Sequence, residues 1–169
     1  TTRTPRPNEK NSKDYFFVSK NQFKKLIKKK EFLEHAKVFD NYYGSSKKQV
    51  NEKLKNGKNI IFDIDWQGTK QIRNKKLNYK LLTIFILPPS KNELLKRLKK
   101  RENNDMKTVK KRMKSFKKDL SRWKEYDLVV INDDLKKCYN KIMKAINDKS
   151  KNNLFDFEFI KKHVKTLTI

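Results

Sequence analysis

The chain has 169 residues, which is enough for one domain of ordinary size with its own hydrophobic core. It carries 45 Lys and Arg residues against 19 Asp and Glu residues, so the formal net charge is +26 and attraction of anionic ligands is expected. No apolar run approaches the roughly 18 residues of a membrane span and no signal peptide is evident, while the single Cys138 excludes an internal disulfide and fits a reducing compartment such as the cytoplasm.

The high charge also suggests a nucleic-acid-binding protein. The lysines are, however, spread along the whole chain instead of being gathered on one element. Clear apolar segments recur throughout, which argues against disorder and in favour of a folded domain.

The first 56 residues predict short strands and capped helices. Pro5 and Pro7 favour an extended loop at the start. Ser19 followed by Gln22 is a capping-box pattern, which marks the start of a helix. In chain order we expect a loop over residues 1–14, a strand over 15–18, a helix from Ser19 to the lysine run at 28–30, a strand over 32–39, a turn over 41–44, and a helix from Ser45 or Ser46 to about Asn56.

The next stretch places two acids beside a short apolar run. Residues 59–65 predict a buried strand that is limited by Gly57 and Gly68 and ends in Asp63 and Asp65, which alternation places on one face. Acids at the carboxyl end of a strand in an α/β sheet are candidates for Mg²⁺, for a ligand N–H or for orienting a lysine. Solvated acids at a polar strand end are the alternative.

The second half of the chain predicts alternating strands and helices. Such alternation implies a parallel sheet with helices on both faces, and the early strand cluster suggests an inserted antiparallel lobe. We expect a central parallel strand over 81–87, a helix capped by Ser90, a longer helix over 106–124, a strand over 127–132, a helix from Asp133 and Asp134 with the apolar stripe Leu135, Tyr139, Ile142 and Ile146, and a short terminal helix over 154–164.

Five short motifs, in this order and at close to family spacing, resemble guanylate kinase. Any one of them is weak, whereas five in register are a strong signal. They are Thr1–Arg6 (TTRTPR), Asp14–Val18 (DYFFV), Phe32–Ala36 (FLEHA) with Asn41–Ser45 (NYYGS), Asp63–Gly68 (DIDWQG), and Leu87–Ser90 (LPPS) with Val130–Asp134 (VINDD).

The resemblance implies an α/β fold of the P-loop nucleoside monophosphate kinase type. This fold has three layers with a parallel core sheet, a small antiparallel GMP-binding lobe and a helical lid. The implied boundaries are a domain over 1–150, with the lobe at about 1–56, the core at about 57–90 and 124–150 and the lid at about 91–123, followed by a tail over 151–169.

The resemblance also implies ATP-dependent phosphorylation of GMP to GDP with Mg²⁺. A carboxylate can accept the two guanine N–H donors that adenine lacks on that edge, and such readout discriminates by ~10⁴ or more. Planar guanidinium groups suit phosphate oxygens. The matching positions are Arg3, Arg6, Tyr15 and Tyr43 for the GMP phosphate; Glu34, Ser45 and Asp65 for guanine; Asp63 near the metal; and Arg97, Arg101 and Arg112 in the lid for the ATP phosphates.

Two features depart from the family pattern. The ATP-binding loop G-x-x-x-x-G-K-[ST] is absent from residues 1–169, whose only glycines are Gly44, Gly57 and Gly68. We therefore expect this chain to bind GMP but to be nearly inactive alone. In the lid, the usual Gly-Arg-Gly is replaced by Lys100-Arg101-Glu102, which predicts reduced hinge freedom.

Two other functions remain open at this point. One is a catalytically inactive guanylate-kinase-like module that binds protein partners, which the absent loop favours. The other is nucleic-acid binding, in which the arginines would be ordinary solvated charges. For the enzyme we expect no membrane, no specific nucleic acid, and a monomer or homodimer.

Overall fold

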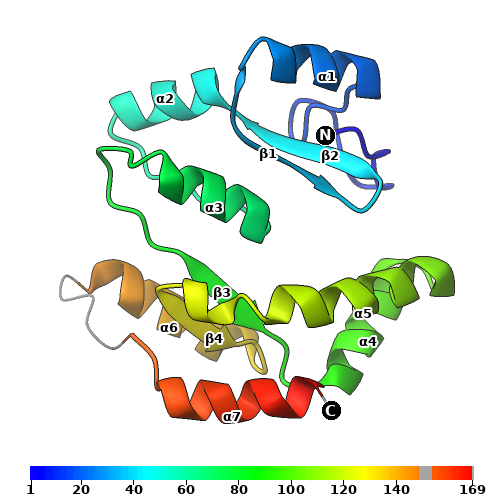
Figure 1. Cartoon of the computed structure of the whole chain (residues 1–169), viewed down its shortest axis with the longest axis vertical. Coiled ribbons are helices and arrows are strands. Elements are labelled where there is room, and N and C mark those ends of the chain that lie inside the picture. The colour runs from blue at the N-terminus through cyan, green and yellow to red at the C-terminus, as the bar shows by residue number, and fades with distance from the viewer. Residues whose placement is uncertain (149–153, 169) are drawn as a thin grey trace. The chain divides into compact units, whose positions relative to one another are not determined.

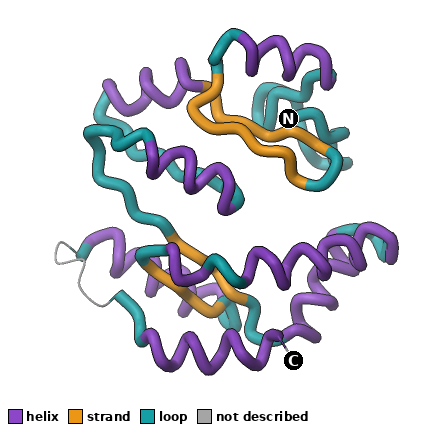
Figure 2. Tube along the Cα trace, viewed as in Figure 1, coloured by secondary structure: helices purple, strands orange, loops and turns teal. Residues whose placement is uncertain are grey.

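The computed structural model describes residues 1–148 and 154–168 (Figure 1). The chain divides into two compact units, Thr1–Tyr79 and Lys80–Ile169. Both units combine helices and strands, as the tube in Figure 2 shows. Among the helices of the described ranges, none is both long and apolar enough to cross a membrane.

The first unit is built on an antiparallel hairpin. Strand β1 (Phe32–Val38) pairs with β2 (Asn41–Ser46), and the hairpin is accompanied by α1 (Lys20–Lys28), α2 (Lys47–Lys55) and α3 (Trp66–Asn74). The predicted strand at 32–39 and the predicted helices of this region are confirmed.

Local capping explains where the helices of this unit begin and end. Ser19 and Gln22 form the predicted capping box, with both reciprocal hydrogen bonds present. The Ser46 side chain accepts a hydrogen bond from the first turn of α2. Gly57 follows the last turn of α2 with a φ of 71°, the left-handed conformation that glycine adopts without strain.

The predicted turn over residues 41–44 is wrong, because these residues form most of β2. The chain reverses one step earlier, at Phe39 and Asp40, and Phe39 has a positive φ of 56°. Gly44 serves packing instead of turning: a Cβ there would lie 2.8 Å from the Phe32 ring. The glycine therefore allows a close approach inside the sheet.

The strands predicted over 15–18 and 59–65 are also wrong. Tyr15 forms only an isolated bridge with Asn11, and residues 59–65 belong to no strand, with Ile61 92% exposed. A strand needs a neighbour that accepts and donates its backbone hydrogen bonds. Within the described residues the only paired strands are β1 with β2 and β3 with β4.

The second unit contains the predicted parallel pairing. Strand β3 (Ile84–Leu87) runs parallel to β4 (Leu128–Ile131), although β3 begins three residues later than expected. A parallel pair needs a long crossover, which here consists of two helices and a 3-10 turn. The other elements of this unit are α4 (Lys91–Arg101), α5 (Met106–Leu120), η1 (Trp123–Glu125), α6 (Leu135–Asn147) and α7 (Phe157–Thr168).

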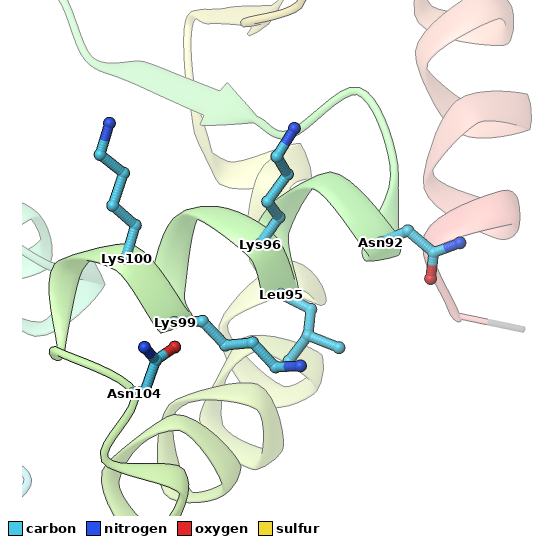
Figure 3. Close-up of a pocket in the computed structure, with 6 residues that line it drawn as sticks. All are labelled: Asn92, Leu95, Lys96, Lys99, Lys100 and Asn104. Atoms are coloured by element: carbon cyan, nitrogen blue, oxygen red, sulfur yellow. The ribbon is translucent and has the colours of Figure 1, made fainter.

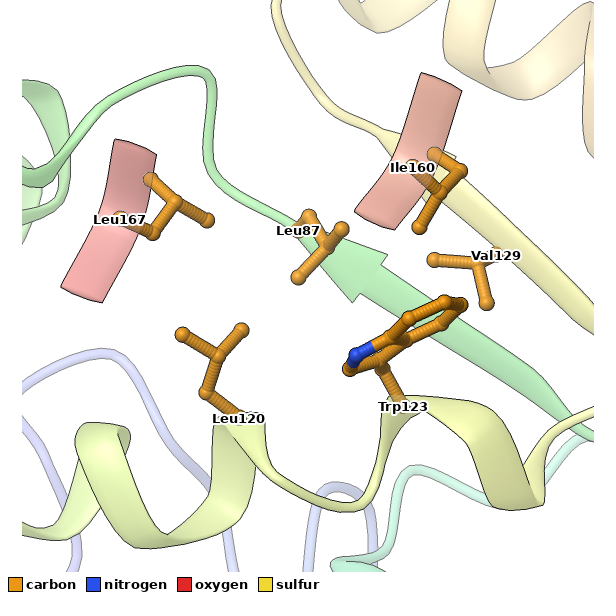
Figure 4. Close-up of a cluster of buried hydrophobic side chains, with 6 residues drawn as sticks. All are labelled: Leu87, Leu120, Trp123, Val129, Ile160 and Leu167. Carbon is orange, nitrogen blue, oxygen red and sulfur yellow. The ribbon is translucent and has the colours of Figure 1, made fainter. Parts of the chain in front are cut away.

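Both faces of the parallel pair are covered, so this unit has a helix–sheet–helix arrangement. Side chains alternate across β4, so Val129 faces one way and Leu128 and Val130 face the other. One face packs against the end of α5, η1 and α7 (Figure 4), through Leu87, Leu120, Trp123, Val129, Ile160 and Leu167. The opposite face packs against α6, through Leu128, Val130, Cys138 and Ala145.

Two helices of this unit differ from their predicted form. The predicted stripe of α6 is confirmed at Ile142, which packs against the core, and is wrong at Leu135, Tyr139 and Ile146, which are 77%, 58% and 43% exposed. The buried positions of this helix are Cys138 and Ala145. The terminal helix occupies Phe157–Thr168 instead of 154–164. Since this helix contributes to the core, the residues predicted as a tail take part in the fold; the predicted tail residues 151–153 and 169 lie outside the described part.

We expect Leu87→Ala to lower the free energy of unfolding of the second unit by about 2–5 kcal/mol, because Leu87 is fully buried between β4 and α7. Urea unfolding followed by Trp123 fluorescence in a Trp66→Phe background measures this unit. The matched control is Leu135→Ala on the exposed position of α6, which should change the same quantity by less than about 0.5 kcal/mol. Equal losses in the two variants would contradict the assigned core.

Candidate functional site

A buried carboxylate lies at the centre of the first unit. Glu34 on β1 is 3% exposed, and its Oε1 accepts a hydrogen bond of 2.7 Å from the Ser45 hydroxyl on β2. The hairpin register places Glu34 opposite Ser45, so strand pairing itself brings the two side chains together. The antiparallel hairpin is therefore the scaffold that positions this pair.

The first turn of α3 closes the space beside this carboxylate. Glu34 Oε2 lies 2.5 Å from the point where a Cβ on Gly68 would stand. A side chain at position 68 would therefore displace the carboxylate. The glycine that ends the Asp63–Gly68 motif is thus required by the close approach of Glu34 to the helix backbone.

Burial raises the pKa of Glu34 above its ordinary value, and the nearby negative charge of Asp65 adds to the increase. The Ser45 hydrogen bond acts in the opposite direction, because it stabilises the ionised form. A carboxylate in this setting gains from a ligand that brings further N–H donors.

Asp65 has a structural role that the sequence did not reveal. It is the N-cap of α3: its Oδ1 accepts from the backbone N–H groups of Gln67 at 3.0 Å and Gly68 at 3.1 Å. Its Oδ2 accepts from the Gln67 side-chain amide at 2.8 Å. An Asp directly before the predicted helix was the available signal for this cap. Contact between Asp65 and guanine stays a prediction.

Two predicted phosphate-binding arginines converge on one acid. Arg3 Nη2 lies 2.8 Å from Glu9 Oε1, and Arg6 Nη1 lies 3.4 Å from the same oxygen. The Arg6 backbone N–H donates to Glu9 Oε2 at 2.8 Å. Sequence reasoning missed Glu9, although it is the first acid that follows both arginines in the same loop.

The Glu9 carboxylate holds both guanidinium groups in one place. The backbone N–H of Arg6, followed by the side chain of Arg3, lowers the pKa of Glu9, so the ionised form is favoured. The Arg3 guanidinium also lies over the Tyr15 ring, 5.5 Å from its centroid. Since a guanidinium has five N–H donors, pairing with Glu9 leaves donors for a phosphate.

The two predicted tyrosines lie beside these arginines. The rings of Tyr15 and Tyr43 meet edge to face with centroids 6.3 Å apart. Burial raises the pKa of Tyr15, and the negative charge of Asp63 adds to the increase, so the hydroxyl remains a donor at neutral pH. Asp63 itself is exposed. The first unit therefore gathers its predicted site residues in two groups, one of Arg3, Arg6, Tyr15, Tyr43 and Asp63 and one of Glu34, Ser45 and Asp65.

The predicted lid arginines belong to the second unit. Arg97 Nε lies 2.8 Å from Glu93 Oε1, and its Nη1 donates to the Asn132 carbonyl at 3.0 Å, which ties the helix to the end of β4. That these arginines act together with the residues of the first unit stays a prediction.

Glu102, the residue that departs from the family pattern, lies between the other two lid arginines. Its Oε1 is 3.7 Å from Arg101 Nε and 3.0 Å from Arg112 Nε. The Arg112 N–H does not point at this oxygen with hydrogen-bond geometry, so the contact is an ion pair. With Glu102 only 16% exposed, an ATP phosphate would compete with it for both arginines.

No three His, Cys, Asp or Glu side chains within residues 1–148 and 154–168 come together as a metal site. Mg²⁺ in phosphoryl-transfer sites is commonly held by one or two carboxylates together with substrate phosphates. The exposed Asp63 fits that coordination, because it leaves the remaining positions to phosphate oxygens and water.

Comparison with known proteins gives a consistent result. A family model described as guanylate kinase matches residues 1–149. The guanylate kinase of Buchnera aphidicola subsp. Schizaphis graminum (strain Sg) is 41% identical over 169 residues, which cover 95% of this chain and 81% of the relative. That of Wigglesworthia glossinidia brevipalpis is 42% identical over 167 residues, with 99% of this chain and 80% of the relative covered.

A solved structure shares the fold as well. The crystal structure of guanylate kinase from Anaplasma phagocytophilum has a TM-score of 0.72 and 27% sequence identity, and the match covers 99% of this chain and 82% of that chain. This similarity confirms the predicted α/β fold class of the nucleoside monophosphate kinases.

We expect Gly68→Ala to weaken binding of a guanine nucleotide by tenfold or more, because displacing a hydrogen-bonded buried carboxylate costs about 1–3 kcal/mol. The fold should persist, since alanine is the better helix former. Isothermal titration with GMP measures the affinity. Lys70→Ala, on an exposed position of the same helix, is the matched control and should bind normally. Normal binding by Gly68→Ala would show that Glu34 does not receive the base.

We expect Asp65→Ala to lower the free energy of unfolding of the first unit by about 0.5–2 kcal/mol, because α3 loses its N-cap. Asp65→Asn should retain most of that stability, since asparagine caps equally well. Trp66 fluorescence during urea unfolding, in a Trp123→Phe background, reports both values. If Asn and Ala were equally destabilising, the charge and not the cap would be the stabilising feature.

Proposed function

Because the chain belongs to the guanylate kinase family, we propose that it binds GMP and takes part in transfer of a phosphoryl group from ATP, giving GDP and ADP. The observation that carries this proposal is the buried Glu34–Ser45 pair beside Gly68. This is a recognition site for adjacent N–H donors, and guanine presents such donors at N1 and at its exocyclic amine.

The base contacts follow from the geometry of Glu34. Ser45 occupies one lone-pair direction of Oε1, which leaves the other positions of the carboxylate to the ligand. The ionised carboxylate accepts two guanine donors side by side. Adenine offers no such pair on that edge, so a buried acceptor would remain unpaired, and this cost provides the selectivity.

The phosphate contacts follow from the arginine loop. Arg3 and Arg6, already oriented by Glu9, present guanidinium donors to the dianionic phosphate of GMP. Tyr15 and Tyr43 add hydroxyl donors beside them. Holding the phosphate in a fixed orientation supports transfer, because phosphoryl transfer depends mainly on positioning and electrostatics.

The remaining predicted roles concern ATP. Mg²⁺ bound with ATP would supply charge neutralisation on the phosphates, and Asp63 would hold it or its water. Arg97, Arg101 and Arg112 would neutralise charge on the transferred group after Arg101 and Arg112 exchange Glu102 for phosphate oxygens. We expect this chemistry to serve purine nucleotide metabolism in the cytoplasm, by a monomer or homodimer.

No glycine-rich ATP loop occurs among residues 1–169. We therefore propose that this chain by itself binds GMP selectively and transfers phosphate slowly. A chain extended at its amino end by the ATP loop of a relative should have full activity.

Two measurements test the function. Titration at moderate salt should show GMP binding and at least 100-fold weaker AMP binding, and ADP release by the extended chain should depend on GMP. Glu34→Gln should lose the preference for GMP over AMP while keeping the fold. GMP-independent ADP release, or none at all, by a folded extended chain would refute the enzyme proposal.

The absent loop also favours a second candidate, a guanylate-kinase-like module that binds protein partners and has no activity. Such a module has no need to discriminate GMP from AMP. Selective GMP binding by the chain itself therefore decides between the two candidates. Nucleic-acid binding, in contrast, would fall steeply with salt and show no base preference.

A further inference from the structure

The first unit contains a cavity that the predicted GMP-binding residues do not line. It has a volume of about 260 Å³ and is walled by β1 and by residues of α1, α2 and α3 or next to them. His35 lines it, whereas the neighbouring Glu34 does not. The cavity is therefore distinct from the Glu34–Ser45 pair, although both involve β1.

Three lysines from three different elements line this cavity. Lys30 follows α1, Lys47 is the first residue of α2, and Lys75 follows α3. No acid is among the lining residues. In the part of the chain that the structure describes, none of the three ammonium groups forms an ion pair.

We propose that this cavity binds a small multivalent anion of the phosphate class, of which inorganic diphosphate is the simplest probe. Three unpaired cations that share one cavity repel one another, and a bound anion removes that repulsion. Lys47 lies at the positive amino end of α2, whereas Lys30 and Lys75 lie at the negative carboxyl ends of α1 and α3, so the attraction for an anion comes from the three ammonium charges and not from the helix dipoles. The volume is smaller than the roughly 300–1,000 Å³ typical of pockets for drug-sized ligands, which limits the occupant to a small ion or the phosphate end of a larger one.

The walls of the cavity are fixed by the backbone. The Gln71 side chain accepts from the His35 N–H at 3.2 Å and donates to the His35 carbonyl at 2.7 Å, which fastens α3 to β1. The Lys47 N–H donates to the Glu31 carbonyl at 2.8 Å. The lysine side chains therefore extend from anchored positions, and binding has only their rotamers to order.

The other lysine-lined hollow lacks this convergence. It measures about 610 Å³, and its lysines all come from α4: Lys96 and Lys100 point to one side, whereas Lys99 lies alongside Leu95 (Figure 3). A set of cations on one helix that point in different directions is an ordinary solvated face. Lysines alone thus do not mark an anion site. What distinguishes the cavity of the first unit is that its three lysines come from three different elements.

Calorimetric titration with sodium diphosphate tests the proposal, in the presence of saturating GMP so that Arg3 and Arg6 are occupied. The unmodified chain should bind one equivalent. The variant Lys30→Gln/Lys47→Gln/Lys75→Gln should bind at least tenfold more weakly. The control Lys28→Gln/Lys53→Gln/Lys70→Gln removes the same charge from equally exposed positions of α1, α2 and α3 that do not line the cavity, and it should change the affinity less than twofold.

Equal losses in the two triple variants, or no saturable binding by the unmodified chain, would overturn the proposal. GMP affinity should be unchanged in both triple variants, so failure of this site is distinguishable from failure of the GMP site. Lys30→Gly guards against misfolding: Lys30 has a φ of 55°, a conformation that glycine adopts more easily, so this variant should fold and still bind diphosphate more weakly. Unweakened binding by Lys30→Gly would remove Lys30 from the site.

Discussion

The hydrogen bond between Glu34 and Ser45 is the interaction on which the rest of the candidate site depends. It joins β1 to β2 through side chains, and the same carboxylate occupies the space that Gly68 leaves at the start of α3. One buried carboxylate therefore connects the two strands of the hairpin with the first turn of a helix and requires glycine at position 68. A buried charge is costly unless it is well paired, and one serine supplies only part of what a carboxylate can accept. The free energy that the first unit gives up in burying Glu34 is recovered when a ligand with two N–H donors binds.

Several arginines of this chain form ion pairs with its own acids. Only 19 acids accompany 45 basic residues, yet Glu9 and Glu102 are placed against four of the five predicted phosphate-binding arginines: Arg3, Arg6, Arg101 and Arg112. An ion pair of this kind orients a guanidinium before the substrate arrives, but it also competes with a phosphate for the same donors.

For Glu9 the orienting effect dominates, since its carboxylate is fixed by a backbone N–H and its arginines keep further donors. For Glu102 no backbone hydrogen bond fixes the contact and the N–H geometry is poor, so exchange for a phosphate is easier.

Features encoded within a few residues could be predicted from the sequence, and features that depend on distant partners could not. Ser19, Ser46, Ser90 and Asp134 cap the helices that they were expected to start, because a cap needs only the next three residues. Residues 59–62 have the composition of a strand, but a strand also requires a neighbour, and none lies beside them within the described ranges. The site residues were found through motif order, which encodes distant contacts indirectly. Glu9 was missed because its role depends on how the loop of residues 1–14 folds back on its own arginines.

The contrast between arginines and lysines explains why a basic chain can hold two distinct anion sites. The arginines of the candidate GMP site are few, partly buried and paired with acids, so their geometry is defined and their net charge is small. Lys30, Lys47 and Lys75 have no acid in their cavity, so their attraction for anions comes from uncompensated charge.

A planar guanidinium selects by shape, whereas an ammonium acts as a point charge that accepts many orientations. The first site is therefore suited to one nucleotide, and the second to any compact anion of sufficient charge. Because β1 contributes to both sites, occupation of the second brings negative charge to the strand that carries Glu34.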